Sequence, residues 1–175
     1  MVNSAKAIFL DRDGVIIEAP VINDTPKSSK TLNEIKLCKG IASFCKFYLK
    51  KNFYLIMITN QPDYSRKTNT KKNINNINNF LKKKLILHDV CVCFCDEKDN
   101  CINRKPKPGM ILKSKKKYNL DLKKSFLIGD RWRDIGAGNN AKCKTIFINK
   151  NYKEKMKFKP TYEIKYLSEI YKIIK

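Results

Sequence analysis

Two aspartates separated by a single arginine, Asp11 and Asp13, are the residues of this chain best suited to chemistry. They directly follow the apolar run 7–10, at the point where a buried strand has to leave the core. In an open α/β sheet, ligands bind outside the carboxyl ends of the strands. Two carboxylates at such a place can hold a hard cation and supply both a nucleophile and a proton donor. The pair therefore points to the transfer of a phosphoryl group.

Two further segments offer groups that bind phosphate. Thr59 and Asn60 follow a second buried run and provide a hydroxyl and an amide for hydrogen bonds to phosphate oxygens. Arg104 and Lys105 provide fixed positive charge just before an expected helix. The N-terminus of a helix also favours anions, so charge and dipole act together there.

A fourth strand end carries another acidic pair, Asp130 and Asp134. Asp130 can complete a set of oxygen ligands for Mg²⁺ together with Asp11, and Asp134 can orient the site or begin the next helix. In such a site Asp11 is the expected nucleophile, which forms an aspartyl-phosphate. Asp13 is the expected general acid for the leaving alcohol and then the base for the attacking water. Each segment alone is compatible with a surface loop, but their common position favours one active site.

The elements that have to position these residues alternate along the chain. Buried strands are expected at residues 6–10, 54–59, 90–94, 125–129 and 145–148, and apolar residues at helical spacing lie between them. A last amphipathic helix is expected over residues 164–174. This alternation predicts an α/β fold, a Rossmann-like three-layer sandwich with a mostly parallel sheet and helices on both faces. We expect one domain over residues 1–175. The polar segment 18–37 is expected to form a flap over the first strand end and is too short to be a large cap domain.

Four motifs in this order carry a resemblance to a known family. They are Phe-Leu-Asp-Arg-Asp-Gly, Ile-Thr-Asn-Gln, Arg-Lys-Pro-Lys-Pro-Gly-Met and Ile-Gly-Asp-Arg-Trp-Arg-Asp. Over about residues 5–150 the chain resembles the haloacid dehalogenase (HAD) superfamily of phosphatases. More narrowly it is similar to the capless branch that contains heptose bisphosphate 7-phosphatases and histidinol-phosphatase domains.

The resemblance assigns a role to each motif. It implies Asp11 as the nucleophile, Asp13 as the acid and base, and Thr59 and Lys105 as phosphate ligands. Arg104 matches the position that contacts substrate beside the lysine. The resemblance also implies that Mg²⁺ is bound by Asp11, the backbone carbonyl of Asp13, and Asp130.

The resemblance also implies a substrate, a small phosphorylated metabolite. We expect hydrolysis of the sugar bisphosphate D-glycero-D-manno-heptose 1,7-bisphosphate to the 1-phosphate, a step that in the family feeds nucleotide-heptose synthesis. Histidinol phosphate and a polynucleotide 3′-phosphate are the alternative substrates. A non-catalytic nucleic-acid-binding module is the alternative of another class, but a pure binder needs neither the aspartates nor the lysine of these motifs.

A cluster of cysteines precedes Arg104. The branch usually carries a zinc loop at this place, with the pattern Cys-x-His followed by Cys-x-Cys. Cys93 and Cys101 match two of these ligands, Cys95 stands where His is expected, and Asn103 stands where the last Cys is expected. Three thiolates can hold a structural Zn²⁺ with water, Cys91 or a nearby carboxylate as the fourth ligand. A metal-free loop that retains part of the site is the alternative, and both interpretations stay open.

The composition sets limits on partners and location. Lys and Arg number 38 against 16 Asp and Glu, a net charge of +22. The basic residues are spread along the chain and accompany many Asn and Ile, which favours a compositional bias over a nucleic-acid partner. No apolar run reaches the roughly 18 residues of a membrane span, and the N-terminus lacks a signal-peptide pattern. We therefore expect a cytoplasmic, monomeric enzyme without a membrane partner.

The single histidine, His88, lies outside the motifs and is expected on the surface or in a loop.

Overall fold

Buried apolar runs form the centre of the computed structural model, which describes residues 4–22 and 25–175. Six strands make one sheet in the order β5-β4-β1-β6-β7-β8, and neighbouring strands pair in parallel. Their bounds are β1 Lys6–Leu10, β4 Phe53–Asn60, β5 Asp89–Cys93, β6 Phe126–Gly129, β7 Lys144–Ile148 and β8 Tyr162–Ile164. All five predicted strands are present, with ends that shift by one residue at most.

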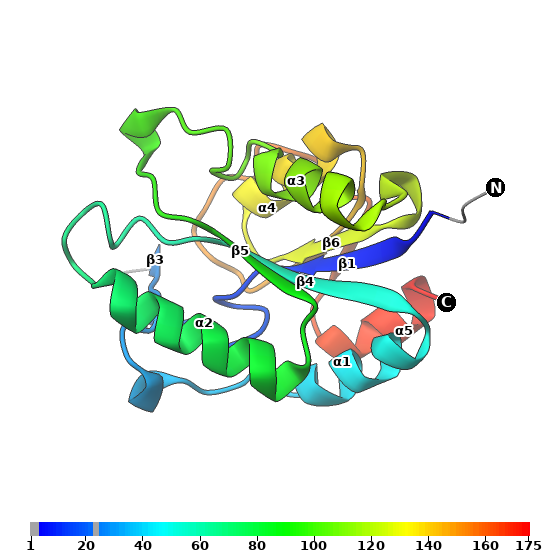
Figure 1. The fold of residues 1–175 in the computed structure, drawn as a ribbon, viewed down its shortest axis with the longest axis horizontal. Helices are drawn as coiled ribbons and strands as arrows, with labels where there is room; N and C mark the ends of the chain where they lie inside the picture. The colour runs from blue at the N-terminus through cyan, green and yellow to red at the C-terminus, as the bar shows by residue number, and fades with distance from the viewer. Residues whose placement is uncertain (1–3, 23–24) are drawn as a thin grey trace.

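Helices cover both faces of this sheet (Figure 1). One face carries α3 (Gly109–Tyr118) and α4 (Trp132–Ala141). The other carries α1 (Ile41–Lys50), α2 (Lys71–Leu85) and α5 (Ile170–Ile173). The predicted three-layer α/β sandwich is confirmed, and the described part of the chain contains no large cap.

Strand β1 shows why the sequence folds this way. Successive side chains of a strand point to opposite faces, and both faces of a parallel sheet are buried. Ile8 and Leu10 pack into the cluster beneath α1, α2 and α5, whereas Ala7 and Phe9 pack into the cluster beneath α3 and α4. All four side chains are fully buried, so the run contains no polar residue until Asp11.

The order of the strands places a crevice at the end of β1. β1 lies between β4 and β6, and Leu10 pairs with Met57 on one side and with Ile128 on the other. The chain builds the sheet outward from β1 in both directions, which is the arrangement that opens a binding crevice at the carboxyl ends of the strands. The motifs that follow β1, β4 and β6 therefore meet there.

The segment 18–37 lies over the same end of the sheet, as predicted. It contains the short antiparallel strands β2 (Val21–Ile22) and β3 (Thr25–Pro26). Pro26, Lys27 and Ser28 line one cavity together with Asp11. The segment therefore forms a small flap at one side of that cavity, and Figure 1 shows β3 on the side of the sheet where α2 lies.

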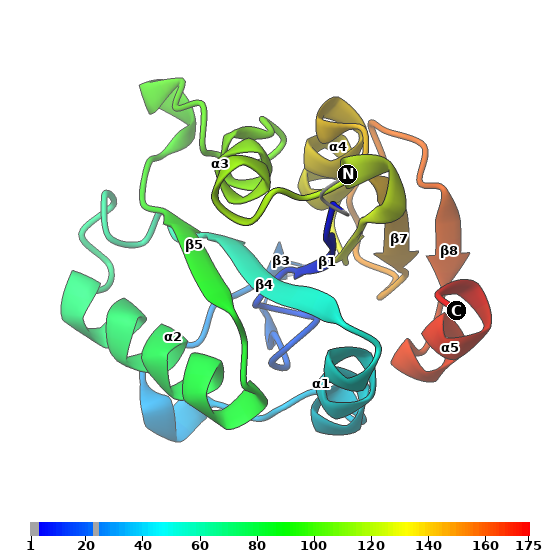
Figure 2. The same cartoon turned by 45° about the vertical axis from the view of Figure 1, so that its right-hand side comes forward.

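The C-terminal segment differs from its prediction. The expected helix over residues 164–174 was wrong in its first half, because Ile164 belongs to β8 and the α-helix begins only at Ile170. The same apolar spacing is satisfied in another way: Ile164, Ile170 and Ile174 all pack into the cluster that also holds Leu10. Figure 2 shows β8 beside β7 at the edge of the sheet, with α5 next to it and near α1.

Tyr48 of α1 holds this C-terminal segment in place. Its hydroxyl donates a hydrogen bond to the carbonyl oxygen of Ile174 at 2.9 Å, and the ring is fully buried. Tyr48→Phe leaves that buried acceptor without its donor, so we expect a loss of about 1 kcal/mol in the free energy of unfolding, measured in urea. Tyr166→Phe is the matched control, because Tyr166 is 70% exposed, and its effect should stay within about 0.5 kcal/mol. Equal effects of the two changes would contradict this role.

Candidate active site

The ammonium group of Lys105 lies at the centre of the crevice. Its Nζ donates to Asp11 Oδ1 at 2.6 Å, to Asp134 Oδ1 at 2.5 Å and to the carbonyl oxygen of Ile58 at 3.1 Å. The lysine is only 3% exposed. Burial alone lowers the pKa of a lysine, but the two carboxylates outweigh it and raise the pKa of Lys105. The group is therefore a fixed positive charge that joins the strand ends of β1 and β6.

Three carboxylates surround this single ammonium group. Asp11, Asp130 and Asp134 each place an oxygen within 4.8 Å of the others, and all three are buried. Burial raises the pKa of Asp11 to about 6, with Lys105 opposing the rise and Asp134 adding to it. Burial also raises the pKa of Asp130 well above its ordinary value, and the neighbouring aspartates add to this.

One oxygen atom of this cluster tests whether the site suits a cation. Asp130 Oδ2 accepts a hydrogen bond from the Tyr152 hydroxyl at 2.9 Å, whereas the buried Asp130 Oδ1 has no hydrogen-bond partner among the described residues. Buried carboxylates are normally paired or coordinate a metal. Oxygen donors of this kind are the ligands that Mg²⁺ prefers. The residues present therefore fit a divalent cation between Asp11 and Asp130, whereas both oxygens of Asp134 already accept hydrogen bonds.

Two glycines allow the acidic groups to approach one another. Gly14 has a φ of +91°, and a Cβ atom on it would lie 1.7 Å from Asp130 Oδ2. A Cβ atom on Gly129 would lie 2.1 Å from the Cβ atom of Asp134. Any side chain at either position would push an aspartate out of the cluster.

Asp13 lies beside this cluster in a different environment. Its Oδ2 accepts hydrogen bonds from Gln61 Nε2 at 2.9 Å and from the Ser28 hydroxyl at 3.2 Å. Arg12 donates to the same carboxylate through Nε at 3.1 Å. The Arg12 side chain is fully buried and also donates to Gln61 Oε1 and to Asn78 Oδ1 of α2. Asp13 is thus held by donors from the flap, from the β4 loop and from its own neighbour.

Sequence reasoning gave no role to Arg12 or to Gln61. From the sequence alone, an arginine between two aspartates is expected to be exposed to solvent. Arg12 is buried because it donates a hydrogen bond to Asn78, which lies 66 positions away in the chain. Gln61 is part of a motif, but its contacts with Asp13 and with the Thr59 hydroxyl depend on how the loop after β4 turns back.

The two polar residues at the end of β4 have different partners. Thr59 is buried, and its Oγ1 accepts a hydrogen bond from Gln61 Nε2 at 2.9 Å. Asn60 Oδ1 accepts from the backbone N–H of Lys105 at 3.0 Å, and Asn60 Nδ2 donates to the carbonyl oxygen of Lys105 at 3.1 Å. Both residues line the cavity that also holds Asp11. Asn60 thereby positions the backbone of Lys105, and its predicted contact with phosphate stays a prediction.

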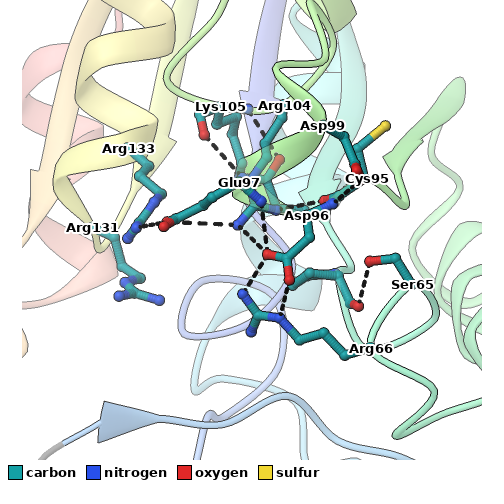
Figure 3. Close-up of polar contacts among 12 residues, drawn as sticks. Ser65, Arg66, Cys95, Asp96, Glu97, Asp99, Arg104, Lys105, Arg131 and Arg133 are labelled. Carbon is teal, nitrogen blue, oxygen red and sulfur yellow. Dashed lines mark hydrogen bonds and ion pairs between the residues drawn. The ribbon is translucent and has the colours of Figure 1, made fainter.

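Alternating charges form a row of ion pairs beside Lys105, which we call the rim (Figure 3). Arg66 makes a bidentate pair with Asp96, at 2.7 and 2.6 Å. Arg104 donates to the carbonyl oxygen of Cys95 at 2.8 Å and lies 3.9 Å from Asp96 and 3.8 Å from Glu97. Hydrogen bonds from Arg66 and the charges of both arginines hold the pKa of Asp96 well below its usual range.

The rim continues onto the N-terminus of α4. Arg133 forms an ion pair with Glu97 and another with Glu154, the latter at 3.3 Å. Arg131 pairs with Glu154 at 2.7 Å. Arg131 and Arg133 line the same cavity as Asp11. Neither arginine was singled out from the sequence, although each is the direct neighbour of a motif aspartate.

The three cysteines predicted as zinc ligands do come together. The sulfur atoms of Cys93, Cys95 and Cys101 lie within 4.8 Å of one another, and the Sγ atoms of Cys93 and Cys101 are 3.9 Å apart. This donor set fits three positions of a tetrahedral zinc site. Cys91 instead contacts the Ser114 hydroxyl at 3.5 Å, so its thiol has another partner.

Comparisons with known proteins agree with this geometry. A family model described as HAD-hydrolase-like matches residues 102–170. A D-glycero-alpha-D-manno-heptose-1,7-bisphosphate 7-phosphatase from Campylobacter jejuni is 35% identical over 153 residues, which cover 85% of this chain and 86% of the relative. The chain belongs to the HAD superfamily of phosphatases. As predicted, it is a phosphoric monoester hydrolase of the capless type.

Two further HAD proteins show the range of this similarity. The histidine biosynthesis bifunctional protein of a Buchnera aphidicola strain is 35% identical over 156 residues, covering 85% of this chain but 41% of that protein. The crystal structure of D,D-heptose 1,7-bisphosphate phosphatase from B. bronchiseptica, complexed with magnesium and phosphate, shares the fold with a TM-score of 0.82. It is 23% identical and covers 96% of this chain and 97% of that chain.

Smaller predictions from the sequence are also resolved. His88 lies between α2 and β5 and accepts a hydrogen bond from the Leu55 backbone N–H, which confirms a loop position without a catalytic contact. None of the described helices has the length and apolar character needed to cross a membrane.

The unpaired oxygen of Asp130 leads to a test by metal binding. Mg²⁺ at about 100 times its dissociation constant adds about 2.7 kcal/mol of stability, which should raise the Tm by about 5 to 10 °C for a chain of this size. Asp130→Asn should abolish this rise and should not lower the Tm of the metal-free protein, because the amide oxygen can still accept from the Tyr152 hydroxyl and the change removes repulsion with Asp11 and Asp134. Glu163→Gln, at an exposed position, is the control and should retain the rise. An unchanged Mg²⁺ effect in Asp130→Asn, measured by differential scanning fluorimetry, would exclude Asp130 as a ligand.

Proposed function

We propose that this phosphatase hydrolyses D-glycero-D-manno-heptose 1,7-bisphosphate to the 1-phosphate in a Mg²⁺-dependent reaction. The observation that supports the reaction is the buried Lys105 ammonium, which joins Asp11 to Asp134 and lies beside a carboxylate cluster. The substrate is supported by the names of the Campylobacter relative and of a 33% identical relative from Helicobacter pylori.

The proposed reaction begins at Asp11. Its carboxylate attacks phosphorus in line with the leaving oxygen, and the bond from phosphorus to that oxygen breaks. Asp13 transfers its proton to the leaving sugar oxygen. In the second step Asp13 takes a proton from water, the water oxygen attacks phosphorus, and the Asp11 carboxylate is released with inorganic phosphate. Lys105 and Thr59 lie at the carboxyl end of the sheet, where they can donate to the oxygens of the transferring group.

Metal and positioning groups complete the proposed site. Asp11, Asp130 and the backbone carbonyl of Asp13 would hold Mg²⁺, which neutralises negative charge on the transferring phosphoryl group. Arg12 and Gln61 orient the Asp13 carboxyl group toward the leaving oxygen. Asn60 fixes the backbone that carries Lys105.

Histidinol phosphate is the second candidate substrate, and the Buchnera bifunctional protein favours it. The heptose bisphosphate is preferred because the relatives with that name are matched over most of their length, whereas the bifunctional protein is matched over less than half of its length. The net charge of +22 is the only feature that suggests a polynucleotide 3′-phosphate. A cytoplasmic location, a monomeric state and a single domain over residues 1–175 remain part of this proposal.

A substrate panel with an Asp11 variant tests the proposed function. The wild-type protein should release phosphate from the heptose bisphosphate faster than from histidinol phosphate or a 3′-phosphorylated oligonucleotide, and only with Mg²⁺ present. Asp11→Asn should lower kcat by a factor of at least about 10⁴, since removal of a nucleophile leaves only the residual rate. Full turnover by this variant would exclude Asp11 as the nucleophile, and faster release from another panel member would reassign the substrate.

We also propose that Cys93, Cys95 and Cys101 hold a structural Zn²⁺ that braces the loop carrying Arg104 and Lys105. The support is the short distance between the three sulfur atoms. Purified protein should contain close to one zinc per chain by elemental analysis, and Cys101→Ser should lose it and lower the Tm. Cys91→Ser is the matched control and should keep the zinc, because Cys91 contacts Ser114. Wild-type protein free of zinc after growth with zinc would contradict the proposal.

A further inference from the structure

The loop that follows β7 joins the active site although none of the four motifs lies in it. Residues 149–154 leave the sheet directly after Ile148, and we call them the β7 loop. β7 pairs in parallel with β6, with Phe147 opposite Gly129. The β7 loop therefore starts at the same carboxyl edge of the sheet as Asp130, where ligands bind in an open α/β fold.

Tyr152 of the β7 loop holds one oxygen of Asp130. Its hydroxyl donates to Asp130 Oδ2 at 2.9 Å, and the aspartate is 1% exposed. No second donor contacts this carboxylate within the described residues, so Oδ1 is buried without a hydrogen bond. One hydroxyl therefore decides which oxygen of Asp130 is left for a cation.

The backbone of Gly14 confines the same oxygen. A Cβ atom on Gly14 would lie 1.7 Å from Asp130 Oδ2, so this oxygen packs directly against the glycine. Oδ2 thus has both a hydrogen bond to Tyr152 and close contact with the loop after β1. Both contacts limit rotation of the carboxylate and leave Oδ1 as the oxygen suited to a metal.

Further contacts fix the place of Tyr152. The backbone N–H of Glu154 donates to the carbonyl oxygen of Tyr152 at 2.7 Å. The Glu154 carboxylate accepts two hydrogen bonds from the guanidinium of Arg131, at 3.0 and 2.7 Å. At the other end of the β7 loop, the N–H of Asn149 donates to the carbonyl oxygen of Ile164 in β8 at 2.8 Å. The hydroxyl is therefore held in place from both ends of the loop.

We infer that Tyr152 is a positioning residue for the metal of this site. Its hydroxyl holds Asp130 Oδ2, so that Oδ1 is the oxygen offered to Mg²⁺. Carboxylates that ligate a metal are commonly hydrogen-bonded by outer groups, and loss of such a group typically lowers metal affinity about 10- to 100-fold. The inference rests on the proposed Mg²⁺-dependent reaction and adds the β7 loop to the elements that support it.

Tyr152→Phe tests this role, because it removes the hydroxyl and keeps the ring. Isothermal titration of metal-free protein with Mg²⁺, in the absence of substrate, should give a dissociation constant about tenfold above that of the wild type. Tyr166→Phe is the matched control. Tyr166 lines the same hollow as Tyr152 but is 70% exposed, and its removal of a hydroxyl should leave the Mg²⁺ affinity unchanged. Circular dichroism checks that both variants are folded.

Steady-state kinetics give a second readout. In Tyr152→Phe, the Mg²⁺ concentration for half-maximal phosphate release from the heptose bisphosphate should rise about tenfold. The change in kcat at saturating Mg²⁺, and in KM for the sugar, should be much smaller. Excess metal can fill a weakened metal site, whereas it cannot replace a lost nucleophile or proton donor. Tyr166→Phe should behave as the wild type.

The outcomes separate this inference from the proposed function. Wild-type protein that releases no phosphate from the heptose bisphosphate at any Mg²⁺ concentration would overturn the proposed function, and the calorimetric titration would still test Tyr152 because it needs no turnover. Wild-type Mg²⁺ affinity in Tyr152→Phe would overturn the positioning role, including the case in which only the Tm of the metal-free protein falls. A loss of kcat that saturating Mg²⁺ does not restore would overturn it as well.

Discussion

The rest of this site depends on one buried ion, the ammonium group of Lys105. It bridges Asp11 after β1 and Asp134 at the start of α4, and it also bonds to a backbone carbonyl of β4. A buried charge is costly unless it is paired and hydrogen-bonded. The strand ends are therefore drawn together around the lysine, and the lysine stays charged because carboxylates surround it.

The balance of charge around Lys105 explains the next layer of the site. One ammonium against three buried carboxylates leaves negative charge in excess, with an unpaired oxygen on Asp130. A divalent cation held by Asp11 and Asp130 would offset this excess and would favour the binding of a phosphate dianion. Farther out, the sign reverses: Arg104, Lys107, Arg133 and Lys157 line a neighbouring hollow in which Glu97 is the one lining carboxylate among the described residues. The local arrangement of charge, rather than the total of +22, supports the proposed sugar bisphosphate substrate.

The sequence predicts the central strands and most of the site residues, for physical reasons that differ from one residue to another. A central parallel strand such as β1 is buried on both faces, so it appears as an uninterrupted apolar run that ends at a functional group. An edge strand such as β8 has three residues and no such run, and its apolar residues fit a helix equally well. The partners of Arg12 and Asn60 are distant in the sequence. No local sequence pattern therefore predicts the burial of Arg12 or the hydrogen bonds between Asn60 and the backbone of Lys105. The cysteine pattern predicted which thiols meet, but not which group is the fourth ligand.

The central claim is that Asp11, paired with Lys105, accepts the phosphoryl group. Its most direct test is to quench the enzyme during steady-state turnover of the heptose bisphosphate with Mg²⁺ and to reduce it with borohydride, which converts an aspartyl-phosphate to homoserine. Peptide mass spectrometry should then find homoserine at position 11, in an amount that disappears without substrate. Homoserine at position 13, 130 or 134 in place of position 11 would contradict the account.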